Sequence, residues 1–500
     1  MGGYLIFYAT NWGPWAFSDS AAYLSAARNL QAGDGAIIHN SNGSITPVTE
    51  FPPLYPFLLS LCTPLKGNFI SSARWLNIIF FTFSIFIIGF LGQKVFNNYL
   101  TGILSSLFFA VSPLMLDTFS SFMSEPLFIS LLLLLVFLLI EFINSKKNLF
   151  LLAIIVFSAF LPMVRYAGIL FILCVGLCLF VYRNEISQKK IYFVPLYFLI
   201  SLAPVGLWFL NQYQELNKIG GKRFSFSLIF LENIYRSILQ EIKIFSGWVP
   251  YSGIYALNLL NFAIIFLFSS LLIIALVVGL RASRNKLDYG NNKSLLLFNI
   301  SLFFLCAYML FIGITHSLTI PKIDIIDRMM APVFPFLIFI ILGAYEISII
   351  KTKSWLIKSG FILIAMISIR FYGMTSLKSA EMLHNDGLGL TSRLYQESDF
   401  LPKLESLPAN QSMISNSAAF VLFHTNRFPL QVDQFHDRAY GSGDAYGEKS
   451  FREKHAALII LFPEFRNYYG DNSDQLLQSL TTGLRVDYMD ETGGIFYYPE

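Results

Sequence analysis

Charged side chains are scarce in this sequence. Of its 500 residues, 13% are Asp, Glu, Lys or Arg, whereas globular domains carry about 25%. Hydrophobic residues make up 55% and aromatic residues 16%, so the chain is too apolar for a soluble protein. The net charge of +4 is spread over loops and does not indicate nucleic-acid binding.

Cysteine is also rare, and its positions exclude further classes. The four cysteines lie in apolar segments and are typical of small buried residues rather than of a disulfide framework or metal site: Cys62, Cys174, Cys178 and Cys306. The sequence has no Walker loop, GxGxxG or CxxC motif, and no cluster of acids typical of a divalent-metal site. We therefore expect an activity that needs neither a cofactor nor a metal.

The chain contains instead a series of apolar runs near the roughly 20 residues that span a bilayer. They predict about eleven membrane helices, at 2–10 (partial), 71–95, 100–114, 126–143, 149–163, 167–182, 191–211, 257–280, 295–314, 331–350 and 356–372. Because the first run is too short to cross a membrane, we expect that its helix begins upstream of the sequence given, or that the start is assigned late.

The other segments predict two long outer loops and a tail. The first loop, 10–70, contains an amphipathic helix over 19–32 that Ser18 would cap and glycines would end. The second, 212–256, contains another over 226–245. The tail has segments typical of strands at 413–416 and 457–462 and of a hairpin at 485–498. We predict a polytopic α-helical membrane protein, with a membrane domain over 1–372 and a small extracytoplasmic α/β domain over 373–500.

Lysines and arginines indicate the orientation, since they are enriched in cytoplasmic loops. If loop 10–70 lies outside, nearly every short basic cluster falls inside: Lys94, Lys146, Lys147, Arg183, Lys189, Lys190, Arg281, Arg284, Lys286, Lys293, Lys351 and Lys353. The chain then crosses the cytoplasmic (inner) membrane several times and leaves its C-terminal domain outside.

This topology brings polar residues from five separate loops to the outer ends of membrane segments: Asp19, Glu125, Arg165, His316 and Arg328. Their convergence favours a functional site. Each also has a simpler explanation. Asp19 could be an ordinary acid at a helix N-terminus, His316 a solvated loop histidine, and Arg328 an interfacial partner of Asp324 or Asp327.

Arg165 interrupts a long apolar run. As one helix, residues 149–182 would be about 51 Å long, against roughly 30 Å of hydrocarbon. A mid-helix arginine would also cost about 2.5–3.5 kcal/mol. Two short helices that turn at 163–166 fit better and place Arg165 just below the outer surface. Such an arginine needs an anion, which would be either a bound phosphate or the side chain of Glu125 or Asp19.

Five motifs in this order resemble a known group. They are Ser-Asp-Ser-x-x-Tyr (18–23), Pro-Pro-Leu-Tyr-Pro (52–56), Ser-Glu-Pro-Leu-Phe (124–128), Val-Arg-Tyr-Ala-Gly (164–168) and Asp-Arg-Met-Met-Ala-Pro (327–332). The chain resembles the GT-C membrane glycosyltransferases over residues 10–345, and within them the branch of the protein O-mannosyltransferases and lipid A aminoarabinose transferases. Its tail is similar to that branch's outer domains only in position.

The resemblance implies a polyprenyl-phosphate-sugar donor and an inverting transfer to a hydroxyl acceptor, which could be a glycan, a lipid or a protein. Asp19 would accept the proton of the acceptor, while Arg165 and Arg328, with His316 as a further donor, would stabilise the phosphate that leaves. Glu125 occupies the position of the family's second acidic motif and would hold the acceptor or orient an arginine.

Three tyrosines lie within the motifs, Tyr23, Tyr55 and Tyr166. They are candidate substrate contacts, although Tyr55 and Tyr166 are also typical of the aromatic belt at a membrane interface. Related protein mannosyltransferases carry an adjacent acid pair in the first loop, whereas Ser20 follows Asp19 here. That departure weakens the case for a protein acceptor.

A transporter or lipid flippase is the alternative that the hydropathy allows. Transporters place ionisable or helix-breaking residues near the bilayer midplane of paired segments, often within internal repeats. This sequence has no detectable repeat, and its polar residues gather at one face. The glycosyltransferase hypothesis therefore accounts for more of the sequence.

Overall fold

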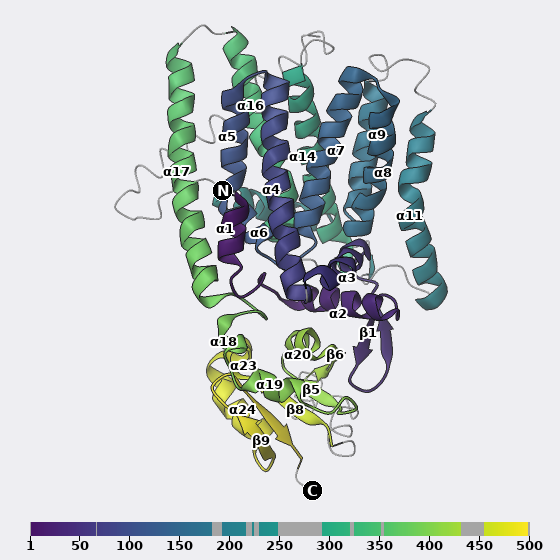
Figure 1. Ribbon diagram of the computed structural model, residues 1–500, viewed down its shortest axis with the longest axis vertical. Helices are drawn as coiled ribbons and strands as arrows, with labels where there is room; N and C mark the ends of the chain where they lie inside the picture. The colour runs from purple at the N-terminus through teal and green to yellow at the C-terminus, as the bar shows by residue number, and fades with distance from the viewer. Residues whose placement is uncertain are drawn as a thin grey trace.

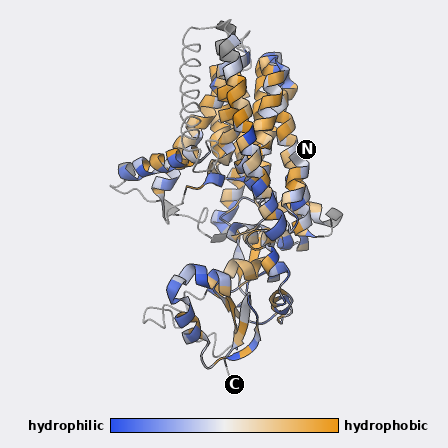
Figure 2. Cartoon of the chain, turned by 90° about the vertical axis from the view of Figure 1, so that its left-hand side faces the viewer, coloured by the Kyte–Doolittle hydropathy of each residue, from blue (hydrophilic) through white to orange (hydrophobic). Residues whose placement is uncertain are grey.

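The computed structural model shows an upright helical bundle with a smaller mixed domain at one end (Figure 1). The structure describes residues 2–66, 68–182, 193–216, 223–224, 230–248, 293–320, 325–351, 355–431 and 455–498. The predicted span 257–280 lies outside these residues, as do Asp324 and much of the second outer loop. Hydrophobic residues predominate along the bundle, and hydrophilic residues are frequent at its lower end and in the smaller domain (Figure 2).

The bundle is built from the predicted apolar runs. Its elements are α1 (Gly2–Ala9), α4 (Phe69–Phe96), α5 (Tyr99–Ala110), α7 (Glu125–Ser145), α8 (Asn148–Val164), α9 (Gly168–Val181), α11 (Phe193–Leu216), α14 (Lys293–Leu318), α16 (Phe334–Lys351) and α17 (Trp355–Asp386). Among the described residues, six helices are long and apolar enough to cross a membrane, and α5 with the bent continuation α6 (Pro113–Phe119) would make a seventh. The chain is therefore a multi-pass membrane protein.

Helix α7 is the centre of the bundle. It contacts α4 on one side and α8 on the other, and most of its span is buried inside the protein. Lys94 and Glu141 form an ion pair of 2.8 Å near the C-terminal ends of α4 and α7. Since Glu125 begins α7, this pair and Lys146 lie at the opposite end of the bundle from Glu125. That separation agrees with the predicted orientation, which remains a prediction.

Short helices lie across the end of the bundle that faces the smaller domain (Figure 1). They include α2 (Ser18–Ala32), α3 (Leu54–Lys66) and α15 (Asp327–Met330), which leads through the short 3-10 helix η3 (Ala331–Val333) into α16. α12 (Phe230–Gly247) packs on α14. The helices predicted at 19–32 and 226–245 are therefore present as α2 and α12, although 226–229 lie outside the described residues; one correction is that α2 begins at Ser18 and its N-cap is Phe17. Gly33 ends α2 in the left-handed conformation, φ 92°.

The smaller domain contains a five-stranded mixed sheet in the order β7-β5-β8-β10-β9. Its strands are β5 (Met413–Ser415), β7 (Leu430–Gln431), β8 (Ala457–Leu461), β9 (Arg485–Met489) and β10 (Gly493–Tyr497), and its helices are α18 (Arg393–Gln396), α19 (Phe400–Glu405), α20 (Ala418–Thr425), α23 (Phe462–Tyr469), η4 (Gly470–Asn472) and α24 (Ser473–Thr481). β5 runs parallel to β7 and β8, while β10 is antiparallel to β8 and β9. The predicted strands and hairpin are confirmed. The boundary predicted after residue 372 falls inside α17.

The first outer loop joins the two parts. Its hairpin, β1 (Ile37–Asn40) with β2 (Ile45–Pro47), extends to β6 (Arg427–Phe428) of the tail, which pairs in parallel with β1. A two-stranded pair, β3 (Arg223–Phe224) with β4 (Thr319–Ile320), lies nearer the bundle. Arg28 of α2 donates from Nη1 to the carbonyl oxygen of Phe423 at 2.7 Å. The tail is therefore attached to the same helix that carries Asp19.

Candidate active site

Asp19 lies in the first turn of α2, and a backbone strap fixes the start of that helix. Trp15 donates its backbone N–H to Ser120 at 2.9 Å and accepts one from Phe122 at 2.8 Å. On the other side, the N–H of Leu390 donates to Ala16 at 2.7 Å. Residues 15–17 thus run beside the segment that leads into α7. This pairing brings Asp19 close to Glu125, although 106 positions separate them in the sequence.

Arg165 occupies the predicted break between two short helices. α8 ends at Val164, Arg165 is extended with φ −149° and ψ 135°, and α9 begins at Gly168. The turn is tight because a Cβ on Gly168 would lie 2.3 Å from the carbonyl carbon of Leu161. With lengths of about 25 and 21 Å, the two helices fall short of the roughly 30 Å of hydrocarbon. The turn therefore directs Arg165 into the end of the bundle.

Glu125 is the buried acid of the site. It begins α7, and its Oε1 lies 2.7 Å from Nη1 of Arg165 and 3.8 Å from Nη1 of Arg328. Its side chain is 1% exposed, and neither carboxylate oxygen accepts an aligned hydrogen bond from the described residues. Two arginines thus surround one dry carboxylate. The predicted pairing of Arg165 with Glu125 is present.

Arg328 contacts the second acid. Its Nη2 donates to Oδ2 of Asp19 at 2.9 Å, and its guanidinium lies 4.2 Å from the ring centroid of Phe17. Its Nε, also buried, has no acceptor among the described residues. Asp327 instead accepts a bond of 2.9 Å from Nε1 of Trp248. The alternative explanation paired Arg328 with Asp324 or Asp327, whereas its acidic partner in the structure is Asp19, 309 positions away.

Tyr23 and Tyr55 form an aromatic wall beside the charges. Both are buried, with ring centroids 5.2 Å apart in an edge-to-face arrangement. The hydroxyl of Tyr23 lies 3.0 Å from Oγ of Ser124, whereas the buried hydroxyl of Tyr55 has no partner among the described residues. Because Tyr55 is fully buried, it does not belong to an aromatic belt at the membrane interface, which was the alternative explanation for this residue.

Tyr166 and His316 lie at the border of this arrangement. Tyr166 donates to the carbonyl oxygen of Thr49 at 3.0 Å and accepts from Nε1 of Trp208 at 3.1 Å, so it connects the arginine turn to the first loop and α11. His316 is buried near the end of α14, not in a solvated loop. It follows Tyr308, which bonds Met329, by eight residues, or about 12 Å of helix.

Asp117 lies near the candidate site, a position that the sequence did not reveal. Its charge interacts with those of Asp327 and Arg328, and its backbone carbonyl accepts a bond of 3.0 Å from Nε1 of Trp15. We expected membrane helix up to residue 114, whereas the structure turns by 60° between α5 and α6. The position of Asp117 between two spans on the outer side was a signal that could have found it.

The four central groups differ in how far they reach solvent. The side chains of Asp19, Arg165 and Arg328 are 27%, 21% and 18% exposed, while that of Glu125 is 1% exposed. Asp19 can therefore meet a bound molecule, and each arginine can offer donors to an anion. Glu125 is shielded from solvent and lies within 4 Å of both arginines. Among the described residues, no group of three or more His, Cys, Asp or Glu is arranged to hold a metal ion.

Both a protein family and several solved structures are similar to this chain. Residues 50–208 match the family described as dolichyl-phosphate-mannose-protein mannosyltransferase. No curated protein matches the sequence significantly. Among solved structures, ArnT from Cupriavidus metallidurans is similar in the apo state, with a TM-score of 0.60 at 12% identity over 99% of this chain and 96% of that one.

Two further structures share the fold. ArnT from the same organism bound to undecaprenyl phosphate has a TM-score of 0.59 at 12% identity, again over 99% of this chain and 96% of that one. The oligosaccharyltransferase of Archaeoglobus fulgidus, in the apo form, has a TM-score of 0.55 at 9% identity and covers 100% of this chain and 74% of its own. The chain therefore has the fold of these membrane proteins. With the family match over residues 50–208, these similarities confirm the predicted resemblance to the membrane glycosyltransferases of the GT-C type.

Proposed function

We propose that this enzyme transfers a sugar from a polyprenyl-phosphate donor to a hydroxyl acceptor, with inversion at the anomeric carbon. The observation that carries the proposal is the Asp19–Arg328 pair beside the Glu125–Arg165 pair at one end of the bundle. A donor of this class needs an acid next to the anomeric carbon and cations next to its phosphate. The undecaprenyl phosphate in the similar ArnT structure supports this choice of donor.

In the proposed step, the acceptor oxygen forms a bond to the anomeric carbon while the bond from that carbon to the phosphate oxygen breaks. The bonding electrons leave with the phosphate, and the acceptor proton passes to the carboxylate of Asp19. Arg165 and Arg328 stabilise the departing phosphate with fixed donors in a site of low dielectric.

Glu125 acts in this scheme as a positioning residue, because it is too deeply buried to meet the acceptor. Tyr23 and Tyr55 form the wall of the donor site, and Tyr166 fixes the arginine turn. The helices over 1–372 form the catalytic membrane domain, in the cytoplasmic (inner) membrane. The domain that follows α17, within the predicted range 373–500, lies outside, as the basic loops predict.

The test uses purified full-length protein and a panel of radiolabelled polyprenyl-phosphate sugars. Asp19→Asn should slow the release of polyprenyl phosphate by about 10²- to 10⁴-fold, while donor binding is retained. Asp34→Asn is the matched control, because Asp34 is an exposed acid just after the same helix. Full activity in Asp19→Asn would refute the role of the base, and failure of the wild type to bind any lipid-linked sugar would refute the proposed donor.

A further inference from the structure

The C-terminal domain contains a pocket that the transfer reaction does not use. Its volume is about 370 Å³, and it is lined by Asn416, Glu464, Phe465, Asn467, Tyr468 and Tyr469. Asn416 directly follows β5, and Glu464 lies in α23, which begins directly after β8. The carboxyl ends of adjacent parallel strands, where this pocket lies, are a common place for ligand sites in α/β folds.

The floor of the pocket is fixed by an amide. Asn416 donates from Nδ2 to the carbonyl oxygen of Leu461 at 3.0 Å, and its Oδ1 accepts from the N–H of Leu461 at 2.8 Å. These two hydrogen bonds connect the loop after β5 to the last residue of β8. The pocket is therefore held in shape by the sheet itself.

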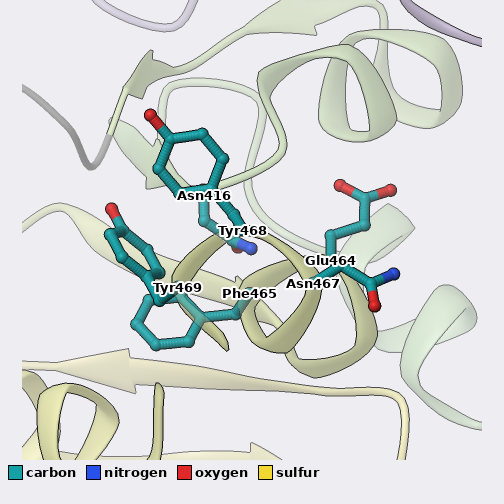
Figure 3. A pocket seen from close by; sticks show the side chains of 6 residues that line it. All are labelled: Asn416, Glu464, Phe465, Asn467, Tyr468 and Tyr469. Carbon is teal, nitrogen blue, oxygen red and sulfur yellow. The ribbon is translucent and has the colours of Figure 1, made fainter. Parts of the chain in front are cut away.

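Aromatic rings form one side (Figure 3). Tyr468 is 74% exposed, an unusual state for so large a ring. It meets Tyr469 edge to face with centroids 4.8 Å apart, and Tyr469 in turn contacts Phe465 at 4.6 Å. The exposed ring of Tyr468 thus packs on Tyr469, which itself packs on Phe465, and offers an apolar surface next to a polar edge.

Polar groups form the other side, where the carboxyl group of Glu464 lies apart from the tyrosine rings (Figure 3). Ser417 hydrogen-bonds the side chain of Glu464, and burial raises the pKa of this carboxyl. The exposed amide of Asn467 completes the lining. No lysine, arginine or histidine is among the described residues that line the pocket. An anionic ligand would find no counter-charge here, whereas a neutral ligand with several hydroxyl groups would find both donors and acceptors.

We propose that this pocket binds a neutral saccharide: the ring of Tyr468 stacks on the apolar C–H face of one pyranose, and Glu464 and Asn467 bond its hydroxyl groups. The volume fits a small ligand. The further idea that this saccharide is part of the acceptor rests on the proposed transferase function. The binding of a saccharide in the pocket does not depend on that function.

The pocket is also connected to the candidate active site. α20 starts two residues after Asn416 and packs on α2, the helix that carries Asp19. Near the other end of α20, the ring of Phe423 meets that of Phe122 at 5.9 Å. One rigid helix thus sets the position of the pocket relative to the active site, as an acceptor glycan held at both places would require.

The test is saturation-transfer NMR on the full-length protein in detergent, with mannobiose, lactose and chitobiose as neutral probes and digalacturonic acid as an anionic one. We expect transfer to at least one neutral disaccharide and none to the acid. Tyr468→Ala should weaken that binding by about tenfold. Because the side chain of Tyr468 is exposed, we expect Tyr468→Ala to fold normally, so that a loss of binding reports on the pocket. Tyr498→Ala is the matched control, an exposed tyrosine of the same domain outside the pocket.

Glu464→Gln retains the shape and should alter which disaccharide is preferred. Transfer that is equal in the wild type and in Tyr468→Ala would overturn the proposal, as would the absence of transfer to every neutral probe. Neither result depends on turnover, so the binding site and the transferase function can fail separately. If both hold, Tyr468→Ala should raise the KM for a saccharide acceptor and leave the KM for the donor unchanged.

Discussion

Replacing Glu125 with glutamine removes the carboxylate that forms an ion pair with Arg165, and the size of the effect can be worked out from the structure. Nη1 of Arg165 lies 2.7 Å from Oε1 of Glu125, and Nη1 of Arg328 lies 3.8 Å from it. With an effective dielectric constant of about 20, these separations correspond to roughly 6 and 4 kcal/mol of attraction before desolvation. Desolvation offsets much of this attraction, because Glu125 is buried.

The net change in the free energy of unfolding should therefore be about 3 kcal/mol for Glu125→Gln, at the lower end for a broken buried pair. The reason is that Arg165 is 21% exposed and can be partly solvated. Arg165→Met should also destabilise, because it leaves the buried carboxylate with only its longer contact to Arg328. The double variant should be less destabilised than the sum of the two, by a coupling energy of about 2 kcal/mol.

The assay is thermal and denaturant unfolding of the detergent-solubilised protein, with the three variants in one cycle. A second cycle with Arg328→Met and Glu125→Gln is the control. Its coupling should be smaller, because that contact is longer by about 1 Å. A change below about 1 kcal/mol for Glu125→Gln would contradict the buried ion pair, because such a value is typical of exposed pairs. Equal couplings in the two cycles would contradict the assignment of Arg165 as the principal partner.

Three other changes follow from single features. Gly168→Ala should cost about 1–3 kcal/mol of unfolding free energy, because its Cβ would meet Leu161; Gly206→Ala, with nothing within 4 Å, is the control, and equal melting temperatures would refute the tight turn. Arg328→Lys retains the charge but loses the planar set of guanidinium donors, so release of polyprenyl phosphate should slow by about a hundredfold. Turnover at the wild-type rate in this variant would show that the charge alone is enough and would refute the role of the guanidinium. Burial lowers the pKa of His424 to about 4 from about 6.5, so the unfolded chain takes up a proton first as the pH falls. Stability should therefore drop between these values, by at most about 3 kcal/mol; His424→Gln should remove this dependence, and an unchanged pH profile in that variant would refute it.

The membrane helices were predictable because their signal is local. A bilayer requires long apolar segments with satisfied backbone groups, so α4, α7 and α14 agree with the predicted spans to within about four residues. The break at Arg165 was predictable for the same reason, since its run was too long and too charged for one helix. The amphipathic helix that begins beside Asp19 and the strands near 413 and 457 also followed from local patterns.

Contacts between distant segments were not predictable in the same way. The sequence offered Asp324 and Asp327 as neighbours for Arg328, but the fold pairs it with Asp19. The sequence predicted that Glu125 and Asp19 lie on one face. It did not predict that Glu125 is buried, which leaves its carboxylate in contact with arginines and out of reach of solvent. Asp117 entered the site only because the chain bends between α5 and α6.

The sequence by itself determined that this protein crosses a membrane, where its polar groups gather and which reaction class they fit. Hydrophobic length and the cost of intramembrane charge depend on each segment alone. The tertiary structure decided which acid meets which arginine, and that the first loop joins β6 of the tail. It also formed the pocket between Asn416 and Tyr468 from segments about 50 residues apart. Such contacts depend on packing and backbone pairing across the whole chain, and no local pattern specifies them.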